Sequence, residues 1–242
     1  MNNTFEKVCI VGLGLIGGSI GLAIKRSNIS NQITGYARSN STLERAIELG
    51  LVDSVKDNLK DAVNNSDLVI LATPLSTFRE LVEEMSPFLK KGCIITDTGS
   101  AKLTVIEDLK DILPNGVEFV PGHPIAGTEE SGPDAGFAEL FDNRWCILTP
   151  TEDNSSNAVD LVKGFWESIG SKVEIMDPMH HDKVLAITSH IPHLIAFNIV
   201  GTANNLANVT EKEVVKYSAG GFRDFTRICL LYTSDAADDV RC

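Results

Sequence analysis

The sequence predicts an α/β fold in which a doubly wound parallel sheet is followed by a smaller all-helical domain. A glycine-rich turn follows the first apolar, strand-like run, and strand-like and helix-like stretches then alternate over most of the 242-residue chain. Beyond Pro178 the strand-like runs stop, and helix-like sequence continues through Ala207 and again from Glu211. We therefore expect a first domain over residues 1–177 and the start of a helical domain over residues 178–228.

The first strand and turn predict a dinucleotide site of the Rossmann type. The apolar run Val8–Val11 leads into a segment that matches the pattern G-x-G-x-x-G. In that pattern the first glycine makes a tight turn and the second lets the backbone approach a pyrophosphate. The third lets the next helix pack on the strand, with the helix N-terminus facing the phosphates. A glycine-rich turn without a ligand is the alternative, and the flanking strand-like and helix-like runs argue against it. The predicted cofactor-binding residues here are Gly12, Gly14, Leu15, Ile16 and Gly17.

The remaining elements of the first domain alternate along the chain. Strands are expected over residues 8–12, 32–36, 67–73, 93–97, 117–120, 145–149 and 172–176. Helices are expected over residues 15–26, 42–50, 76–90, 101–113 and 156–169. Because ligands of such sheets bind at the carboxyl ends of the strands, Thr73 and Pro74 join the predicted cofactor site, and Asp97-Thr98-Gly99-Ser100 is placed at the same edge.

The end of the second expected strand leaves the choice between NAD and NADP open. In NAD-binding folds an acid about 20 residues past the glycines binds the ribose hydroxyls. Here the sequence reads Tyr36-Ala37-Arg38-Ser39, with alanine in the place of that acid. Arg38 and Ser39 can meet a 2′-phosphate, or Arg38 can stack on the adenine while NAD binds. We expect NAD or NADP without a preference.

A loop rich in glycine and proline carries a histidine suited to proton transfer. The segment Gly122-His123-Pro124-Ile125-Ala126-Gly127-Thr128-Glu129 follows the expected strand 117–120. Glycine and proline hold the backbone at particular dihedral angles, so such a loop can keep a side chain still. An imidazole held in this way can accept a proton near neutral pH. A tight surface turn with an incidental histidine is the alternative.

Two clusters of polar residues stand out in the helical region. Ser189-His190-Ile191-Pro192-His193 places two histidines three residues apart on one helix face, with a proline that kinks the helix. They can be partly buried structural histidines or contacts to a small ligand; without a carboxylate at ligand spacing, we expect no metal site. Arg223 and Arg227, in Gly220-Gly221-Phe222-Arg223-Asp224-Phe225-Thr226-Arg227, suit recognition of a carboxylate. A solvated ion network with Asp224 is the alternative.

Composition and charge favour a soluble enzyme with a small-molecule substrate. The net charge of −12 argues against a nucleic-acid partner, which needs clustered lysines and arginines. Cys9, Cys93 and Cys146 lie in apolar runs and form no C-x-x-C pair, which is typical of reduced thiols in a cytoplasmic protein. The segment Met1–Lys7 has no apolar signal region, and no apolar run predicts a membrane span.

In this order the motifs resemble those of the prephenate/arogenate dehydrogenase family, which acts in tyrosine biosynthesis. The resemblance covers roughly residues 7–228, with the segments VGLGLIGGS, DTGSAK, GHPIAGTE, SHIPH and GGFRDFTR. It implies a Rossmann-type domain and a helical domain that dimerises, with the active site between them. On the same basis His123 is the expected catalytic histidine and Ser100 bonds the same substrate hydroxyl. The resemblance further implies substrate-binding roles for His193, His190, Arg227, Glu129, Asp224 and Arg223.

The implied reaction is oxidative decarboxylation. His123 would take the proton of the hydroxyl on the cyclohexadiene ring while hydride leaves for the nicotinamide, and loss of carbon dioxide then makes the ring aromatic. Two rival functions stay open. One is a related dehydrogenase that acts on a β-hydroxy acid or an imine, and the other is a nucleotide-sensing module without catalysis.

The last segment departs from the family. After Ile228 the chain reads CLLYTSDAADDVRC, which resembles translated sequence from outside the gene. We therefore expect residues 229–242 to be a non-native tail and the helical domain to be incomplete. The full-length form is expected to be a homodimer, and the chain as written is expected to bind nucleotide but to dimerise poorly and show little activity.

Overall fold

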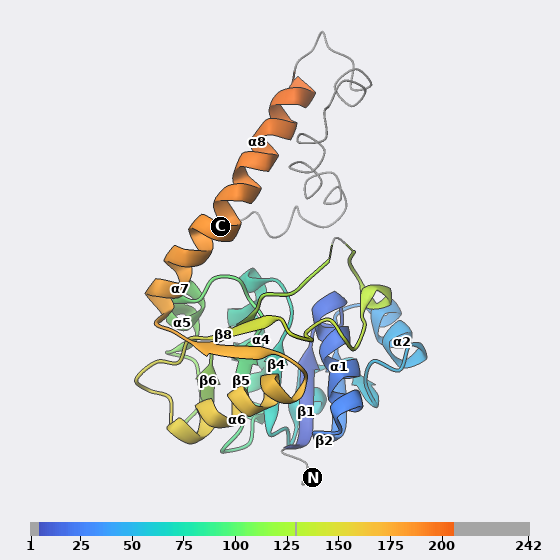
Figure 1. Ribbon diagram of the computed structural model, residues 1–242. Coiled ribbons are helices and arrows are strands. Elements are labelled where there is room, and N and C mark those ends of the chain that lie inside the picture. The colour runs from blue at the N-terminus through green and yellow to red at the C-terminus, as the bar shows by residue number, and fades with distance from the viewer. Residues whose placement is uncertain (1–4, 129, 206–242) are drawn as a thin grey trace. The chain divides into compact units, whose positions relative to one another are not determined.

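The computed structural model describes residues 5–128 and 130–205, and the chain divides by its internal contacts into two compact units, Met1–Asp182 and Lys183–Cys242. The first unit contains a six-stranded parallel sheet in the order β3-β2-β1-β4-β5-β6 (Figure 1). This is the strand order of dinucleotide-binding folds, and it confirms the predicted Rossmann-type sheet. The strands are β1 (Phe5–Val11), β2 (Ser30–Tyr36), β3 (Ser54–Lys56), β4 (Leu68–Leu71), β5 (Ile94–Asp97) and β6 (Glu118–Val120).

Helices cover both faces of this sheet. They are α1 (Leu15–Ser27), α2 (Asn40–Glu48), α3 (Leu59–Val63), α4 (Phe78–Met85), α5 (Leu103–Leu109) and α6 (Ser156–Ser168). Strand β1 shows why its sequence is apolar throughout: Val8 and Ile10 belong to the core cluster under α1, α2 and α6. The alternate residues Cys9 and Val11 belong to the cluster under α3, α4 and α5. A strand buried on both faces needs apolar residues at every position.

A second, three-stranded sheet corrects the expectation of a single sheet. The strands expected at 145–149 and 172–176 are present as β8 (Trp145–Leu148) and β9 (Lys172–Ile175). They pair with each other in parallel, and β8 pairs antiparallel with β7 (Gly122–Pro124), a strand where the sequence indicates a loop. Between β6 and β7 lies Pro121, which has no backbone N–H and whose carbonyl accepts from the Thr149 N–H at 3.0 Å. The short elements β3 and α3 were also not expected, because three to five residues carry too little periodicity.

A continuous helical segment follows the second sheet. It consists of α7 (Pro178–Leu185), a π-helical turn over Ala186–His190 and α8 (Ile191–Asn205). Pro192 is the second residue of α8, so its missing N–H falls just after the π turn. Within residues 5–128 and 130–205, no helix has both the length and the apolar character needed to cross a membrane.

Candidate active site

The glycine-rich turn joins β1 to α1 at the carboxyl edge of the parallel sheet. Gly12 has a φ of +99°, and a Cβ there would lie 2.5 Å from the Ala72 carbonyl oxygen, just beyond β4. A Cβ at Gly17 would lie 1.9 Å from the Gly12 oxygen, so only glycine lets α1 pack this closely on the turn. At Gly14, by contrast, a Cβ would meet nothing within 4 Å. The turn is therefore tight toward the protein and open on the side where a pyrophosphate would approach.

The first turn of α1 is suited to bind an anion. The Gly18 N–H donates to the Gly14 oxygen at 2.8 Å, which leaves the N–H groups of Leu15, Ile16 and Gly17 ahead of the first intrahelical bond. Such N–H groups and the helix dipole favour a phosphate at this end. Thr73 lies at the same edge, because its Cγ2 is 2.8 Å from the position of a Cβ on Gly12. This arrangement, open at Gly14 and lined by helical N–H groups, fits a dinucleotide.

The residues after β2 lie beside this turn. The Gly12 N–H donates to the Tyr36 oxygen at 2.9 Å, which brings the end of β2 next to the end of β1. Arg38 and Ser39 follow and are exposed, and the Ser39 hydroxyl lies 2.6 Å from that of Ser41. Residue 37, where NAD-binding folds often have an acid, is alanine. The expectation that either NAD or NADP can bind therefore stands.

His123 is the central residue of the short strand β7, directly after a peptide held by a buried ion pair. The Asp97 carboxylate accepts from the Gly122 N–H at 3.0 Å, and the Lys102 ammonium donates to the Gly122 oxygen at 2.7 Å. Asp97 and Lys102 are both fully buried and bond each other at 2.5 Å. Charge-assisted bonds of this kind are shorter and stronger than neutral ones. The backbone at His123 is therefore fixed to the end of β5.

The His123 side chain contacts a second histidine. Its Nδ1 lies 2.9 Å from Nε2 of His181, and the two rings meet edge to face with centroids 5.1 Å apart. His181 is fully buried on α7, and its Nδ1 lies 2.8 Å from Oδ1 of Asp182. Burial lowers the pKa of His181, although the neighbouring Asp182 acts in the opposite direction.

The sequence-predicted residues fall into three groups. In the first unit Thr73 lies against the glycine turn, and Pro74 follows it in the chain. Ser100 is exposed and lies between Asp97 and Lys102, which bond the residue before His123. His190 and His193 are half-buried on the helical segment of the second unit, in the π turn and in α8. Glu129, Arg223, Asp224 and Arg227 lie outside the described residues.

Sequence reasoning missed four residues of the network around His123. Asp97 and Lys102 stand in the DTGSAK segment, and they were assigned no role because a buried ion pair leaves no local pattern. His181 and Asp182 follow the last strand at the start of a helix. A histidine next to a carboxylate at such a position is the signal that could have found them.

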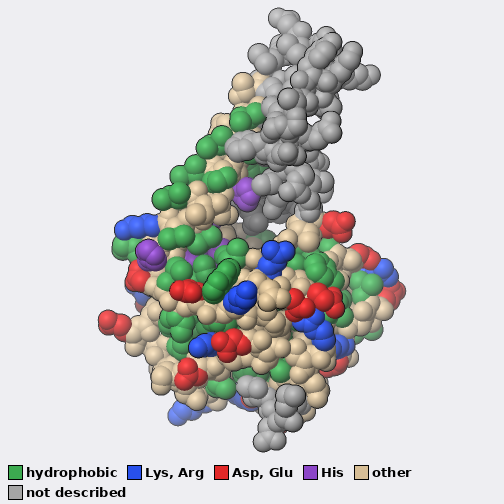
Figure 2. Space-filling model, viewed as in Figure 1, with side chains coloured by type: hydrophobic (Ala, Val, Ile, Leu, Met, Phe, Trp, Pro, Cys, Tyr) green, Lys and Arg blue, Asp and Glu red, His purple; other side chains and the backbone are tan. Residues whose placement is uncertain are grey.

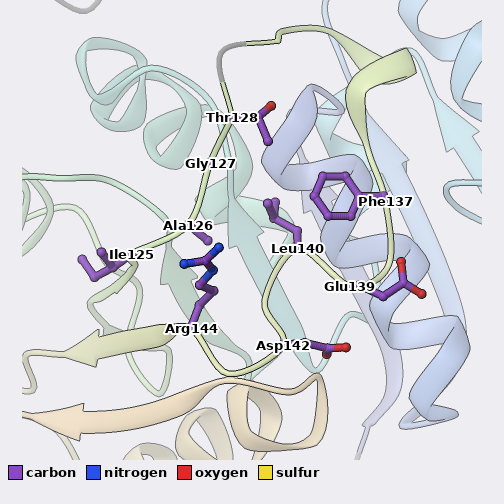
Figure 3. A pocket seen from close by; sticks show the side chains of 9 residues that line it. All are labelled: Ile125, Ala126, Gly127, Thr128, Phe137, Glu139, Leu140, Asp142 and Arg144. Carbon is purple, nitrogen blue, oxygen red and sulfur yellow. The ribbon is translucent and has the colours of Figure 1, made fainter. Parts of the chain in front are cut away.

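A pocket of about 420 Å³ opens beyond the strand that carries His123 (Figure 3). The Arg144 side chain is directed toward Ala126, whereas Asp142 lies by α1, where Arg26 bonds it at 3.0 and 2.5 Å. Among the residues that the structure describes, no predicted site residue lines this pocket. Its lining residues are Ile125, Ala126, Gly127, Thr128, Phe137, Glu139, Leu140, Asp142 and Arg144.

Three cysteines of the described chain, Cys9, Cys93 and Cys146, are buried free thiols. Burial raises the pKa of Cys9 and of Cys93 to about 12, so these thiols are protonated and serve as core residues. In the part of the chain that the structure describes, no group of three or more histidine, cysteine, aspartate or glutamate side chains is arranged to hold a metal ion.

Comparisons with known proteins agree with this architecture. One family model, described as the nucleotide-binding domain of prephenate dehydrogenase, matches residues 20–175, and another, described as its dimerization domain, matches residues 177–230. The chain is 44% identical to a cyclohexadienyl dehydrogenase of Zymomonas mobilis, over 93% of this chain and 76% of that protein. It is 36% identical to a prephenate dehydrogenase of Bacillus subtilis, over 94% of this chain and 62% of the relative.

A solved structure gives the same result in three dimensions. The chain is similar to the crystal structure of prephenate dehydrogenase from A. aeolicus in complex with hydroxyphenyl propionate and NAD+. The TM-score is 0.85 at 38% sequence identity, and the match covers 93% of this chain and 78% of that chain. The likeness therefore extends through the sheet and into the helical segment.

Proposed function

The chain belongs to the prephenate dehydrogenase family, and we propose that it catalyses the oxidative decarboxylation of prephenate, arogenate or both, with NAD or NADP as hydride acceptor. The observation that carries this proposal is the position of His123. The histidine stands at the carboxyl edge of a dinucleotide-binding sheet, and its backbone is held by Asp97 and Lys102. Membership of this dehydrogenase family makes the protein an oxidoreductase, and its nucleotide-binding domain supports a nicotinamide cofactor.

His123 acts as general base in this reaction. Its imidazole accepts the proton of the ring hydroxyl, so the O–H bond breaks and an N–H bond forms while the carbon becomes a ketone. When bound, the nicotinamide supplies the acceptor for the hydride that leaves this carbon. Loss of carbon dioxide then makes the ring aromatic, which favours the products, so the protein mainly has to position the reacting groups.

The remaining predicted residues bind the substrate. Ser100 is exposed at the same edge and can hydrogen-bond the hydroxyl that His123 deprotonates. An acidic protein of net charge −12 needs local positive charge to hold an anionic substrate, which is the role proposed for Arg227 with help from Arg223. His190 and His193 supply polar contacts, and Glu129 and Asp224 control access to the arginine.

We assign residues 1–177 to cofactor binding and residues 178–228 to a domain that pairs with a second copy of the chain. The match of residues 177–230 to a dimerization domain supports this. Apolar side chains at positions i, i+4, i+7 and i+8 of the helical segment are exposed, and Figure 2 shows hydrophobic side chains along it. These residues are Ile187, Ile191, Leu194 and Ile195, with 67, 45, 53 and 46% exposure. The protonated buried thiols fit a cytoplasmic location.

The decisive experiment follows the appearance of reduced nicotinamide with both substrates and both cofactors, using the purified chain with residues 229–242 replaced by the corresponding helices of a full-length relative. His123→Asn should lower kcat by about two to four orders of magnitude with little change in KM, because a general base contributes in that range. His180→Asn, at an exposed histidine on α7, is the matched control and should keep wild-type kinetics. Cofactor binding without turnover of either substrate would contradict the proposal, and a near-normal kcat in His123→Asn would exclude this histidine as the base.

A further inference from the structure

We propose that His181 and Asp182 are positioning residues that fix the tautomer of His123, so that its Nε2 carries the lone pair that accepts the substrate proton. The inference rests on the proposed function, in which His123 is the general base. It follows from two consecutive hydrogen bonds in the first unit, His123 to His181 and His181 to Asp182. The Asp182 carboxylate at one end determines which atom donates in each bond.

Asp182 sets the direction because an ionised carboxylate only accepts hydrogen bonds. Its Oδ1 accepts from the Lys102 N–H at 2.9 Å, and its Oδ2 accepts from the Leu103 N–H at 2.9 Å. Burial favours the neutral acid, but bonds from these N–H groups and from His181 outweigh it and lower the pKa of Asp182. Nδ1 of His181, 2.8 Å from Oδ1, must therefore donate.

The donor role of the His181 Nδ1 determines which nitrogen of His123 is the donor. A buried imidazole whose pKa is lowered carries one proton, and that proton is already on Nδ1. Its Nε2 is then an acceptor, and the group that it faces at 2.9 Å is Nδ1 of His123, which must donate. The neutral His123 ring therefore has its hydrogen on Nδ1 and its lone pair on Nε2. The other tautomer would set two lone pairs against each other across the same distance, with the loss of this hydrogen bond.

The hydrogen bonds from His123 through His181 to Asp182 also stabilise His123 after it has taken the proton. The His123 imidazolium keeps its Nδ1–H bond to His181, and the Asp182 charge lies behind that ring. Lys102 and Asp97 also face His181, but they bond each other at 2.5 Å, so their charges largely cancel. Asp182 thus leaves a net negative charge on the far side of His181. The arrangement follows the logic by which a carboxylate orients a catalytic histidine.

The direct test is the tautomer itself, read from ring nitrogen shifts of the full chain with 15N-labelled histidine. The chain has only five histidines, which single substitutions can assign. At a pH where the rings are neutral, wild-type His123 should show a protonated Nδ1 and an unprotonated Nε2. His181→Leu, which removes the acceptor, should give a mixture of tautomers. His181→Gln, whose amide oxygen can accept from Nδ1–H, should keep the wild-type form. His180→Leu is the control on the same helix.

Steady-state kinetics of the same variants give a second test. His181→Leu should lower kcat by about 10- to 100-fold, less than the ~10²–10⁴-fold contribution of a complete general base, with KM for substrate and Kd for cofactor within about twofold. His181→Gln should recover most of the loss, which a merely structural role would not predict. An Nε2-protonated His123 in the wild type, or unchanged tautomer and kcat in His181→Leu, would overturn the proposal. Failure of the proposed function is distinct, because the wild type would then turn over neither substrate while the tautomer could still be measured.

Discussion

The charged side chains around His123 act on it through two of its neighbours, Gly122 and His181. Asp97 accepts from the N–H of the preceding residue, Gly122, and Lys102 donates to its carbonyl oxygen, whereas Asp182 reaches the imidazole through the His181 ring. The first pair therefore fixes where the residue is, and the second fixes which nitrogen takes the proton. Because Asp97 and Lys102 are fully buried, each is tolerated only in the presence of the other.

Removal of one member of this pair should lower the free energy of unfolding. In Lys102→Met the Asp97 carboxylate stays buried without its cation, which should lower the free energy of unfolding by about 3–5 kcal/mol. Urea unfolding measures the loss. Lys110→Met, at an exposed lysine just after α5, should change it by less than about 0.5 kcal/mol. Equal stability of the two variants would show that the buried pair is not needed.

We also expect a single residue, Ala37, to influence the choice between NAD and NADP. Ala37→Asp places a carboxylate after β2, where it can accept bonds from ribose hydroxyls and repel a 2′-phosphate. The ratio of kcat/KM for NAD to that for NADP should rise by at least about tenfold, which corresponds to ~1.4 kcal/mol. Ala37→Asn, which has a similar shape and no charge, separates repulsion from size. An unchanged ratio in Ala37→Asp would exclude this position from cofactor choice.

In the turn between β1 and α1, one glycine is needed for packing and another for cofactor binding. A Cβ at Gly17 would overlap the Gly12 carbonyl at 1.9 Å, and α1 would have to move away from the sheet. Gly14 has open space around it and a φ of −80°, which alanine can adopt. The motif therefore needs its two glycines for different physical reasons: Gly17 for the packing of α1 on the turn, and Gly14 for the approach of the pyrophosphate.

We expect this difference in a pair of alanine substitutions. Gly17→Ala should destabilise the protein by about 1–3 kcal/mol, as overpacking does, and weaken cofactor binding as a consequence. Gly14→Ala should leave the melting temperature nearly unchanged and raise the Kd for cofactor, since its methyl group occupies the approach of the pyrophosphate. Thermal unfolding and fluorescence titration with NAD measure the two effects. Equal loss of stability in both variants would contradict this assignment.

In the whole molecule, the helical segment presents the exposed apolar stripe formed by Ile187, Ile191, Leu194 and Ile195. Leu194→Lys places a charge in this stripe, at a residue that is 53% exposed, so the subunit's own packing should be little affected. Sedimentation should show a shift from dimer to monomer, with cofactor binding by the first unit retained. Lys183→Glu, at an exposed charged residue outside the stripe, is the control. With residues 229–242 replaced by the corresponding helices of a full-length relative, a wild-type chain that is monomeric at all concentrations would contradict the proposed pairing.

The Rossmann-type sheet and its glycine turn could be predicted from the sequence alone, and so could the candidate base His123. Each of these depends on residues within one element or one turn, where spacing and residue type carry the information. The second sheet and the His123–His181–Asp182 chain were decided by tertiary structure. Strand β7 has three residues, too few for a periodic pattern, and its partner β8 begins more than twenty residues later. His123 and His181 are 58 residues apart, and only the folded chain brings their nitrogens to 2.9 Å.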